Sequence, residues 1–433
     1  MGILGFLSVG VFLQISLPAE PVTFSRDIAP ILFRHCASCH RPDQIAPFSL
    51  LRFEDASKRS KQIVEQVKQG NMPPWKPVAG HGDFLDERRL TPEQIRLLET
   101  WAESGAPEGD PQTLPLTPKF REGFQLGVPD MVFEMSEALT VPAEGPDISM
   151  NFVFPLNLKK ETYLRAVEIL PGNRRVAHHA LGILDVSGAA RKRADADGKD
   201  KGYAAFGTAG WLPAGFTAGY IAGAPPRFFD SDSSLVLKPG MDFVLQVRYH
   251  PSGKVEGDKT RIGLYVTELK PPRECINLLL SSETIDLPPG EKAHKQTDEF
   301  VLPADFEIRS IRPHMHLIGN KLTAEAELPT GVKISLLRID DWDFPWQETY
   351  HFAKPVRLPK GSKIRAEFLF DNSVGNPHNP SDPPKRVAFG ETVADEMAEL
   401  WIGGVATQPA DEAALTQSVF DHFLEIRRKG IKK

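Results

Sequence analysis

Three residues in one short segment could attach a haem. Cys36, Cys39 and His40 stand in the order CxxCH. Two thiols at this spacing can form thioether bonds to a haem, and the adjacent imidazole can then bind the iron as its proximal ligand. A redox-active disulfide is the alternative, but it is typical of a βαβ setting and does not require the histidine. The pattern therefore favours a covalently bound haem c.

A sixth ligand for the iron is expected further along the chain. Met72, in the sequence GNMPPW, carries a soft thioether, and the two prolines after it stiffen its approach. His81 competes for this role, and Met72 as an apolar plug is a third interpretation. We expect Met72 to be the ligand. The remaining cysteine, Cys275, is expected to be a small buried residue in a strand.

Five further histidines fall in or beside expected strands, where a single histidine is usually structural. His314 and His316 are two residues apart, so they point to one face of a strand and can reach one metal. His178 and His179 are adjacent and would point to opposite faces of a regular strand. Joint ligation by this second pair therefore requires a β-bulge or a strand end. His250 is the fifth.

Four ordered segments carry a resemblance to a known family. They are VAHHALG (176–182), LQVRYHPSG (245–253), IRPHMHLIG (311–319) and FDNS…NPHNP…FGETVADEM (370–397). In this order they resemble the copper type II ascorbate-dependent monooxygenases, the family of peptidylglycine α-hydroxylating monooxygenase and dopamine β-monooxygenase. The resemblance covers nearly all of about residues 128–408, and the haem motif makes the chain similar to bacterial members with an N-terminal cytochrome c domain.

The resemblance implies two copper ions per chain. His178 and His179 take the place of ligands to an electron-storing copper, and His314, His316 and Met397 take the place of ligands to an oxygen-binding copper. Imidazole suits both oxidation states of copper, and a thioether favours Cu(I), the form that meets O2. A zinc hydrolase would use a bound water and would need neither a thioether nor a haem.

One position departs from the family. The third ligand of the electron-storing copper falls on Arg248, whose permanent charge prevents metal binding. His250 lies two residues on, hence on the same face of the strand and about 7 Å further along. We expect His250 to substitute, because the turn signal at 251–253 puts it at a strand end that can adapt. The alternative is a solvent-facing His250, with Arg248 paired to an acid.

The substrate region departs too. By the resemblance, Arg312 matches an arginine with which peptide-amidating members hold a carboxylate, while Glu399 and Trp401 replace an asparagine and a tyrosine. Glu399 can pair with Arg312 and neutralise it. We therefore expect a small-molecule or peptide-like substrate other than a glycine-extended peptide.

Length and periodicity indicate how these residues are positioned. The 433 residues correspond to roughly three domains at about 150 residues each. Helical spacing predicts helices at 27–33, 56–68 and 91–104, and hence a small α module. Short alternating runs with turn signals, such as the run from Met241 to Tyr249 with its alternate residues on one face, predict β-sandwiches.

The expected fold is a small all-α cytochrome c-like domain followed by two all-β jelly-roll sandwich domains. We place the units at 1–19 (signal peptide), 22–111 (cytochrome c-like domain), 112–126 (linker), 127–269 (N-terminal β-sandwich), 270–408 (C-terminal β-sandwich) and 409–433 (helical tail).

The N-terminus and the charge balance bear on location and partners. Residues 1–19 carry no charged side chain, and the apolar run at 3–17 is too short to span a bilayer comfortably. We expect a signal peptide, a periplasmic or secreted protein and no stable membrane span after processing; an uncleaved anchor or a buried segment is the alternative. The formal net charge of −6, with basic residues spread out, argues against nucleic-acid binding.

The expected function is that of an exported copper-dependent monooxygenase. It would hydroxylate a substrate C–H bond with O2 and take electrons through the fused haem from an external donor, ascorbate or a redox protein. The alternative is a non-catalytic haem and copper protein for electron transfer or copper binding, in which Arg248 marks the loss of two-copper chemistry. A purely structural sandwich would require coincidence at four motifs.

Overall fold

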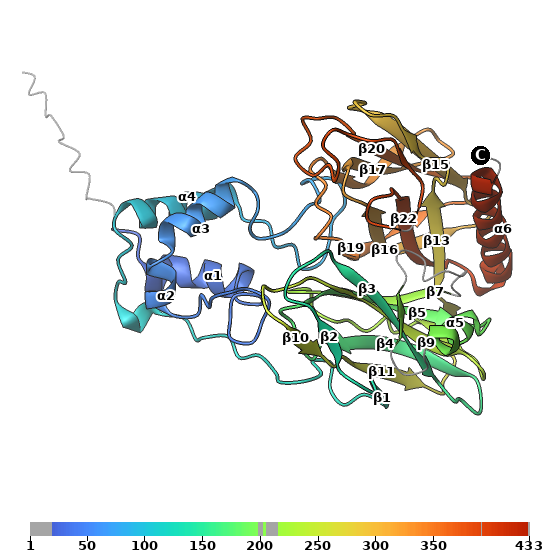
Figure 1. The fold of residues 1–433 in the computed structure, drawn as a ribbon, viewed down its shortest axis with the longest axis horizontal. Coiled ribbons are helices and arrows are strands. Elements are labelled where there is room, and N and C mark those ends of the chain that lie inside the picture. The colour runs from blue at the N-terminus through green and yellow to red at the C-terminus, as the bar shows by residue number, and fades with distance from the viewer. Residues whose placement is uncertain (1–19, 198–201, 205–214, 391, 432–433) are drawn as a thin grey trace, which may run out of the picture.

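The computed structural model describes residues 20–197, 202–204, 215–390 and 392–431. The expected signal peptide lies outside these residues. The described chain is mostly β-sheet with few helices, as predicted (Figure 1). None of the helices in these ranges has the length and apolarity needed to cross a membrane.

The helices near the N-terminus pack around one apolar core that contains Phe24, Leu32 and Trp101. The last of them begins with a capping box, in which Thr91 and Gln94 satisfy each other's backbone N–H groups. The expected helix at 56–68 is divided in two. The helical elements are η1 (Phe24–Ile28), α1 (Ala29–His35), α2 (Phe53–Ser57), α3 (Ser60–Lys68), α4 (Pro92–Glu103) and η2 (Pro111–Thr113).

Two five-stranded sheets form the first β-sandwich. Alternate residues of β9, from Phe243 to Tyr249, lie in the core between the sheets, which confirms the predicted face of this strand. One sheet has the order β1 (Met131–Glu134), β11 (Arg261–Thr267), β4 (Thr162–Leu170), β8 (Ser233–Leu237) and β12 (Arg273–Glu274). The other has the order β6 (Tyr203–Ala204), β3 (Ile148–Pro155), β9 (Asp242–Tyr249), β5 (Ala177–Asp185) and β7 (Gly215–Ile221).

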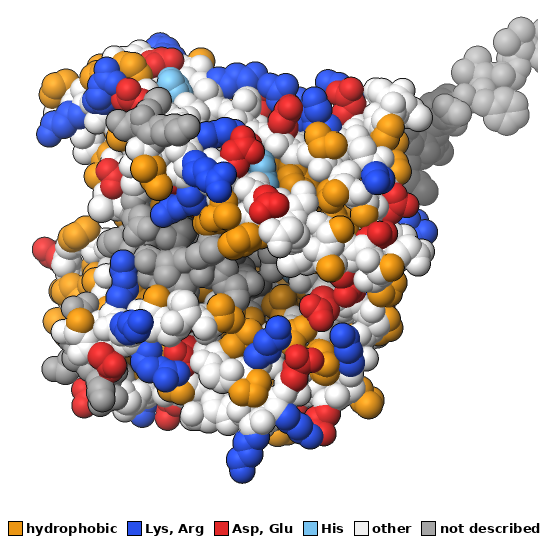
Figure 2. Space-filling view, turned by 90° about the vertical axis from the view of Figure 1, so that its right-hand side faces the viewer, with side chains coloured by type: hydrophobic (Ala, Val, Ile, Leu, Met, Phe, Trp, Pro, Cys, Tyr) orange, Lys and Arg blue, Asp and Glu red, His pale blue; other side chains and the backbone are white. Residues whose placement is uncertain are grey.

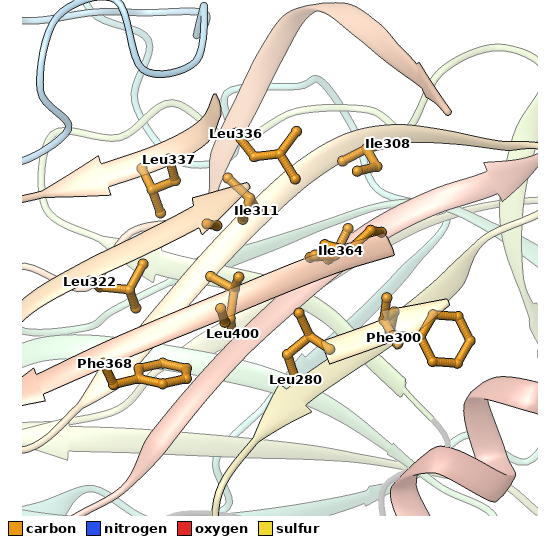
Figure 3. Packing of buried hydrophobic residues seen from close by; sticks show 14 of the residues in the cluster. Leu280, Phe300, Ile308, Ile311, Leu322, Leu336, Leu337, Ile364, Phe368 and Leu400 are labelled. Carbon is orange, nitrogen blue, oxygen red and sulfur yellow. The ribbon is translucent and has the colours of Figure 1, made fainter. Parts of the chain in front are cut away.

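The second β-sandwich has two four-stranded sheets. Its core contains Leu280, Ile311, Phe368 and Leu400, which converge between the sheets (Figure 3). One sheet has the order β13 (Ile276–Ser281), β22 (Ala398–Ala406), β16 (Phe306–Met315) and β19 (Tyr350–Leu358). The other has the order β15 (His294–Val301), β20 (Lys363–Phe370), β17 (Gly319–Glu327) and β18 (Lys333–Ile339).

The remaining elements decorate the sandwiches. His422, on the C-terminal helix, lies 2.8 Å from a carboxylate oxygen of Asp298, so this helix docks on the second sandwich. Seen from the side opposite the helical unit, the sandwiches form two lobes whose charged side chains of both signs are interspersed (Figure 2). These elements are β2 (Leu139–Val141), β10 (Glu256–Asp258), β14 (Asp286–Leu287), β21 (Val387–Ala388), α5 (Ala189–Asp197), η3 (Pro409–Asp411) and α6 (Glu412–Ile431).

The helical unit is docked on the second sandwich by residues 75–88, here called the docking segment, which lie between α3 and α4. The backbone N–H of Leu85 donates to the carbonyl of His351, and the N–H of Ala353 donates to the carbonyl of Asp83, both at 2.8 Å. The docking segment thus extends a sheet of the second sandwich. The helical unit is therefore held by more than the chain that follows it.

Candidate functional site

The strands β16 and β22 place the expected oxygen-site residues on one face. They pair antiparallel, with Arg312 opposite Trp401 and His314 opposite Glu399. The intervening residues, such as Met315, point into the core of the second sandwich. Because side chains alternate along a strand, the paired residues share the face turned toward the first sandwich.

The imidazoles of His314 and His316 are neighbours whose ring centroids lie 5.1 Å apart. Nδ1–H of His314 donates to the amide oxygen of Gln347, and Nδ1–H of His316 donates to the carbonyl of Asp395 at 2.9 Å. Burial lowers the pKa of both, to about 4 for His316, so both rings are neutral at pH 7. Each ring therefore leaves Nε2 as the nitrogen that can bind a metal.

A buried carboxylate ties the expected ligands together. Glu396 accepts the backbone N–H groups of His316 and Ile318, both at 2.8 Å, and that of Met397 at 3.2 Å. Burial raises the pKa of Glu396 to about 8. The side chain of Met397 is buried, directly before β22. Glu396 thus fixes the end of one strand against the start of the other, a role that the sequence analysis missed.

The His178–His179 pair lies at a β-bulge. Along β5 and β9, Ala177 pairs with Tyr249 and His179 pairs with Arg248, so His178 is an extra residue. The two imidazole centroids lie 6.2 Å apart. The structure thus contains the irregularity that joint ligation requires. Nδ1 of His179 is buried without a hydrogen-bond partner among the described residues, which suits a metal ligand.

His250 and Arg248 share one carboxylate. Nδ1 of His250 lies 2.7 Å from one oxygen of Asp147, and Nε of Arg248 lies 3.3 Å from the other. The His250 ring is 64% exposed, follows the end of β9 and has its centroid 6.5 Å from that of His178. Arg248 is paired to an acid and the His250 ring is exposed, as in the alternative stated above for these two residues. Because Asp147 engages Nδ1, His250 can bind a metal through Nε2.

A loop of the second sandwich lies between the two candidate metal sites. This interdomain loop, residues 340–349, connects β18 to β19. Its Trp346 ring lies 6.2 Å from His178, and its Phe344 ring lies 5.7 Å from His316. Gln347 of the same loop accepts the hydrogen bond from Nδ1–H of His314 and so orients that imidazole. Neither a motif nor periodicity marks this loop in the sequence, so its position was not predicted.

The haem motif forms a turn at the end of α1. The backbone N–H of His40 donates to the carbonyl of Cys36 at 2.9 Å, and Nδ1–H of the His40 ring donates to the carbonyl of Phe48 at 3.2 Å. Burial raises the pKa of Cys36 to about 12 and raises that of Cys39. Two protonated thiols and an imidazole with Nε2 available on one turn fit a covalent haem.

The candidates for the sixth iron ligand differ in their surroundings. Met72 is half-buried and follows α3. His81 is engaged elsewhere, since its Nδ1 lies 2.8 Å from the hydroxyl of Ser335 on the second sandwich. The contact attaches the His81 ring to the second sandwich and leaves its Nε2 available, so it does not decide between His81 and Met72. The third cysteine, Cys275, is half-buried and lies between β12 and β13 rather than within a strand.

A cavity of about 580 Å³ lies between the two sandwiches, beside the expected copper-site residues. Its lining includes His179 from the first sandwich and Arg312, Gln347 and Trp401 from the second. Nε1–H of Trp401 donates to Glu399 at 3.0 Å. Two of the expected substrate residues, Arg312 and Trp401, therefore border an open space, and the third, Glu399, contacts Trp401. In the described part of the chain, no three His, Cys, Asp or Glu side chains cluster closely enough to hold a metal, so His178, His179 and His250 lie too far apart here to bind one ion together. The thioether of Met397 is not one of these side-chain types.

Comparisons with known proteins do not identify the chain. No protein-family model matches it, and no curated protein matches its sequence. Solved structures that match include the exported protein XepA of PBSX, with 8% identity over 55% of this chain and 86% of that one and a TM-score of 0.18. The VP2 subviral particle of infectious bursal disease virus matches with 7% identity over 67% of this chain and 76% of that one, with a TM-score of 0.20. PNGF-II matches with 10% identity over 63% of this chain and 65% of that one, with a TM-score of 0.23. Such low TM-scores carry no argument about function.

Proposed function

We propose that the protein is an exported copper-dependent monooxygenase that hydroxylates a substrate C–H bond with O2. The observation that carries this proposal is the pair of neutral imidazoles at His314 and His316, each with Nδ1 held by an oxygen atom, beside the buried thioether of Met397. In this proposal the sandwiches are the two jelly rolls of the copper type II monooxygenases, and the helical unit is a cytochrome c-like domain.

The residues at each site have distinct tasks. His314, His316 and Met397 would hold the oxygen-binding copper. His178 and His179 would hold the electron-storing copper, with His250 joining them once its exposed side chain moves toward the pair. Copper bound there would supply O2 activation and one-electron redox chemistry. Gln347 and the backbone around Glu396 keep the ligands in place, so that little side-chain freedom is lost on metal binding.

The helical unit would hold the haem through Cys36, Cys39, His40 and Met72. Haem c in this unit would supply electrons taken from ascorbate or a redox protein. The attachment turn packs on the first sandwich, since a Cβ added to Gly223 would lie 2.5 Å from Sγ of Cys39. This packing keeps an electron donor close to the copper sites, in addition to the proximity that a linker provides.

Two substitutions test the proposal. His314→Ala and Met397→Ala each remove a ligand of the oxygen site, and we expect each to lower substrate-dependent O2 uptake by more than about 100-fold, the upper end of outer-shell effects. The haem should remain reducible, because it belongs to another folded unit. His378→Ala, an exposed histidine, is the control. O2 uptake that survives either substitution would make these residues structural.

The alternative is a non-catalytic haem and copper protein. The observation that favours it is Arg248, which is buried beside His179 and paired to Asp147 at the expected ligand position. Copper bound without substrate-dependent O2 uptake in the wild-type protein would support this alternative.

A further inference from the structure

The interdomain cavity lies where a substrate of the proposed reaction would be held. Arg312 and Trp401 form one row of the β16–β22 pair, and His314 and Glu399 form the next row on the same face. Adjacent rows on one face are about 7 Å apart. Arg312 and Trp401 line the cavity. A molecule that fills the cavity would therefore reach to within one row of side chains of His314, in the expected oxygen site.

The charges around this cavity are balanced. Five arginines and five carboxylates are among its described lining residues. Arg227 of the first sandwich forms an ion pair with Asp86 of the docking segment. Glu348, which lines the cavity, forms an ion pair with Arg88, which does not line it. These two pairs join all three units around the cavity.

The remaining charges form one network at the junction of the sandwiches. Arg309 lies 2.7 Å from Asp232 and 3.0 Å from Asp230. Glu307 is 3.2 Å from Arg273 and also contacts Arg357. The two arginines beside Asp232 hold the pKa of its carboxyl well below the usual range, so it stays ionised and keeps the network balanced.

Arg312 lines the cavity one row of side chains from His314, and it too has a counter-charge. The Glu399 carboxylate is close enough to Arg312 to interact electrostatically with its guanidinium. Glu399 lies on the neighbouring strand and also accepts the indole N–H of Trp401. A carboxylate ligand would therefore compete with Glu399 for the guanidinium.

The rest of the wall is largely apolar or uncharged. Tyr220, Pro225 and Phe229 line it on one side and Phe352 on the other. Burial lowers the pKa of His351 to about 4, so this lining imidazole is uncharged at pH 7. A charged ligand would lose hydration here without gaining an unused counter-charge, whereas an apolar body gains from burial.

We propose that the interdomain cavity binds a neutral substrate with an apolar body, and that the Glu399 carboxylate is the determinant that rejects anionic substrates. This inference rests on the proposed function for its link to turnover, but the selectivity of the cavity is measurable without turnover.

Three matched probes test this selectivity. The full-length protein is titrated in a calorimeter with 4-phenylbutyramide, 4-phenylbutyrate and 4-phenylbutylammonium, which share one apolar body and differ in charge. We expect the amide to bind at least ten-fold more tightly than either ion. An amide that does not bind, or an ion that binds as tightly as the amide, would overturn the proposal.

The substitution Glu399→Gln localises the effect. Glutamine keeps an acceptor for the Trp401 N–H but removes the charge opposite Arg312, so 4-phenylbutyrate should gain at least ten-fold in affinity while the amide changes little. Glu367→Gln, on β20 of the other sheet, is the matched control. Unchanged affinity for the anion in the Glu399 variant would overturn the assigned role. Binding as expected without O2 uptake would instead refute the proposed function and leave the cavity's selectivity intact.

Discussion

Four of the expected metal-binding histidines share one arrangement. In His40, His250, His314 and His316, an oxygen atom from the backbone, a carboxylate or an amide engages Nδ1. Such a partner fixes the ring orientation and the tautomer, and it makes Nε2 the ligating atom. The same arrangement occurs at His35 and His81, so it prepares a ring for ligation without by itself identifying a metal site.

His250 is an expected copper ligand at a position that the family does not use, and copper binding tests it directly. We expect the wild-type protein to bind two equivalents of copper per chain and His250→Ala to lose one of them, because the remaining pair at the bulge lacks a third donor. Titration with copper and a chelator competitor measures this. The site at His314 and His316 should be unaffected. One equivalent in the wild type, or two in the variant, would require the electron-storing site to be redrawn.

Spacing predicted the candidate ligands but not the residues that contact them. The CxxCH order and the i, i+2 histidines are local patterns, so the turn at Cys36–His40 and the pair at His314 and His316 could be predicted. Gln347 and Asp147 could not, because each contacts a histidine that is distant in the sequence. No periodicity encodes a hydrogen bond between an irregular loop and a strand end.

Individual elements give each motif its geometry. The bulge in β5 brings two adjacent imidazoles near each other, and the turn after α1 brings two thiols and an imidazole together. The helix predicted at 91–104 was found as α4, which begins directly after its cap at Thr91. The break between α2 and α3 was missed, because 56–68 has a helical pattern throughout.

The turn after α1 predicts covalent haem. Replacing Cys36 and Cys39 together by alanine removes both thioether bonds, so the haem should become fully extractable by acid acetone, whereas wild-type haem should stay with the polypeptide. Absorbance of the extract at the haem bands measures the outcome. Cys275→Ala, at the remaining cysteine, is the matched control and should retain its haem. Retention in the double variant would contradict the assignment.

The units form one body through contacts between distant segments. The docking segment, the interdomain loop and the charge network at Asp232 each join parts that are at least 40 residues apart along the chain. Composition predicted three units and a linker, but such contacts depend on the final packing and leave no local signature. A docked cytochrome would be held at a fixed distance from the copper sites, in contrast to a freely tethered one.

Phe84 offers a test of this docking. Its side chain is 7% exposed, lies within the core of the second sandwich and packs on Phe352 at a centroid distance of 4.9 Å. Phe84→Ala should lower the free energy of unfolding by about 3 kcal/mol, because the buried ring leaves a cavity.

The substitution should also expose the docking segment to proteases, since its backbone bonds to the second sandwich lose their apolar support. Chemical denaturation and limited proteolysis measure the two effects. Phe420→Ala, an exposed phenylalanine on α6, is the control and should change the free energy of unfolding by less than about 0.5 kcal/mol. Stability and protease resistance equal to those of the control would mean that Phe84 does not hold the helical unit on the second sandwich.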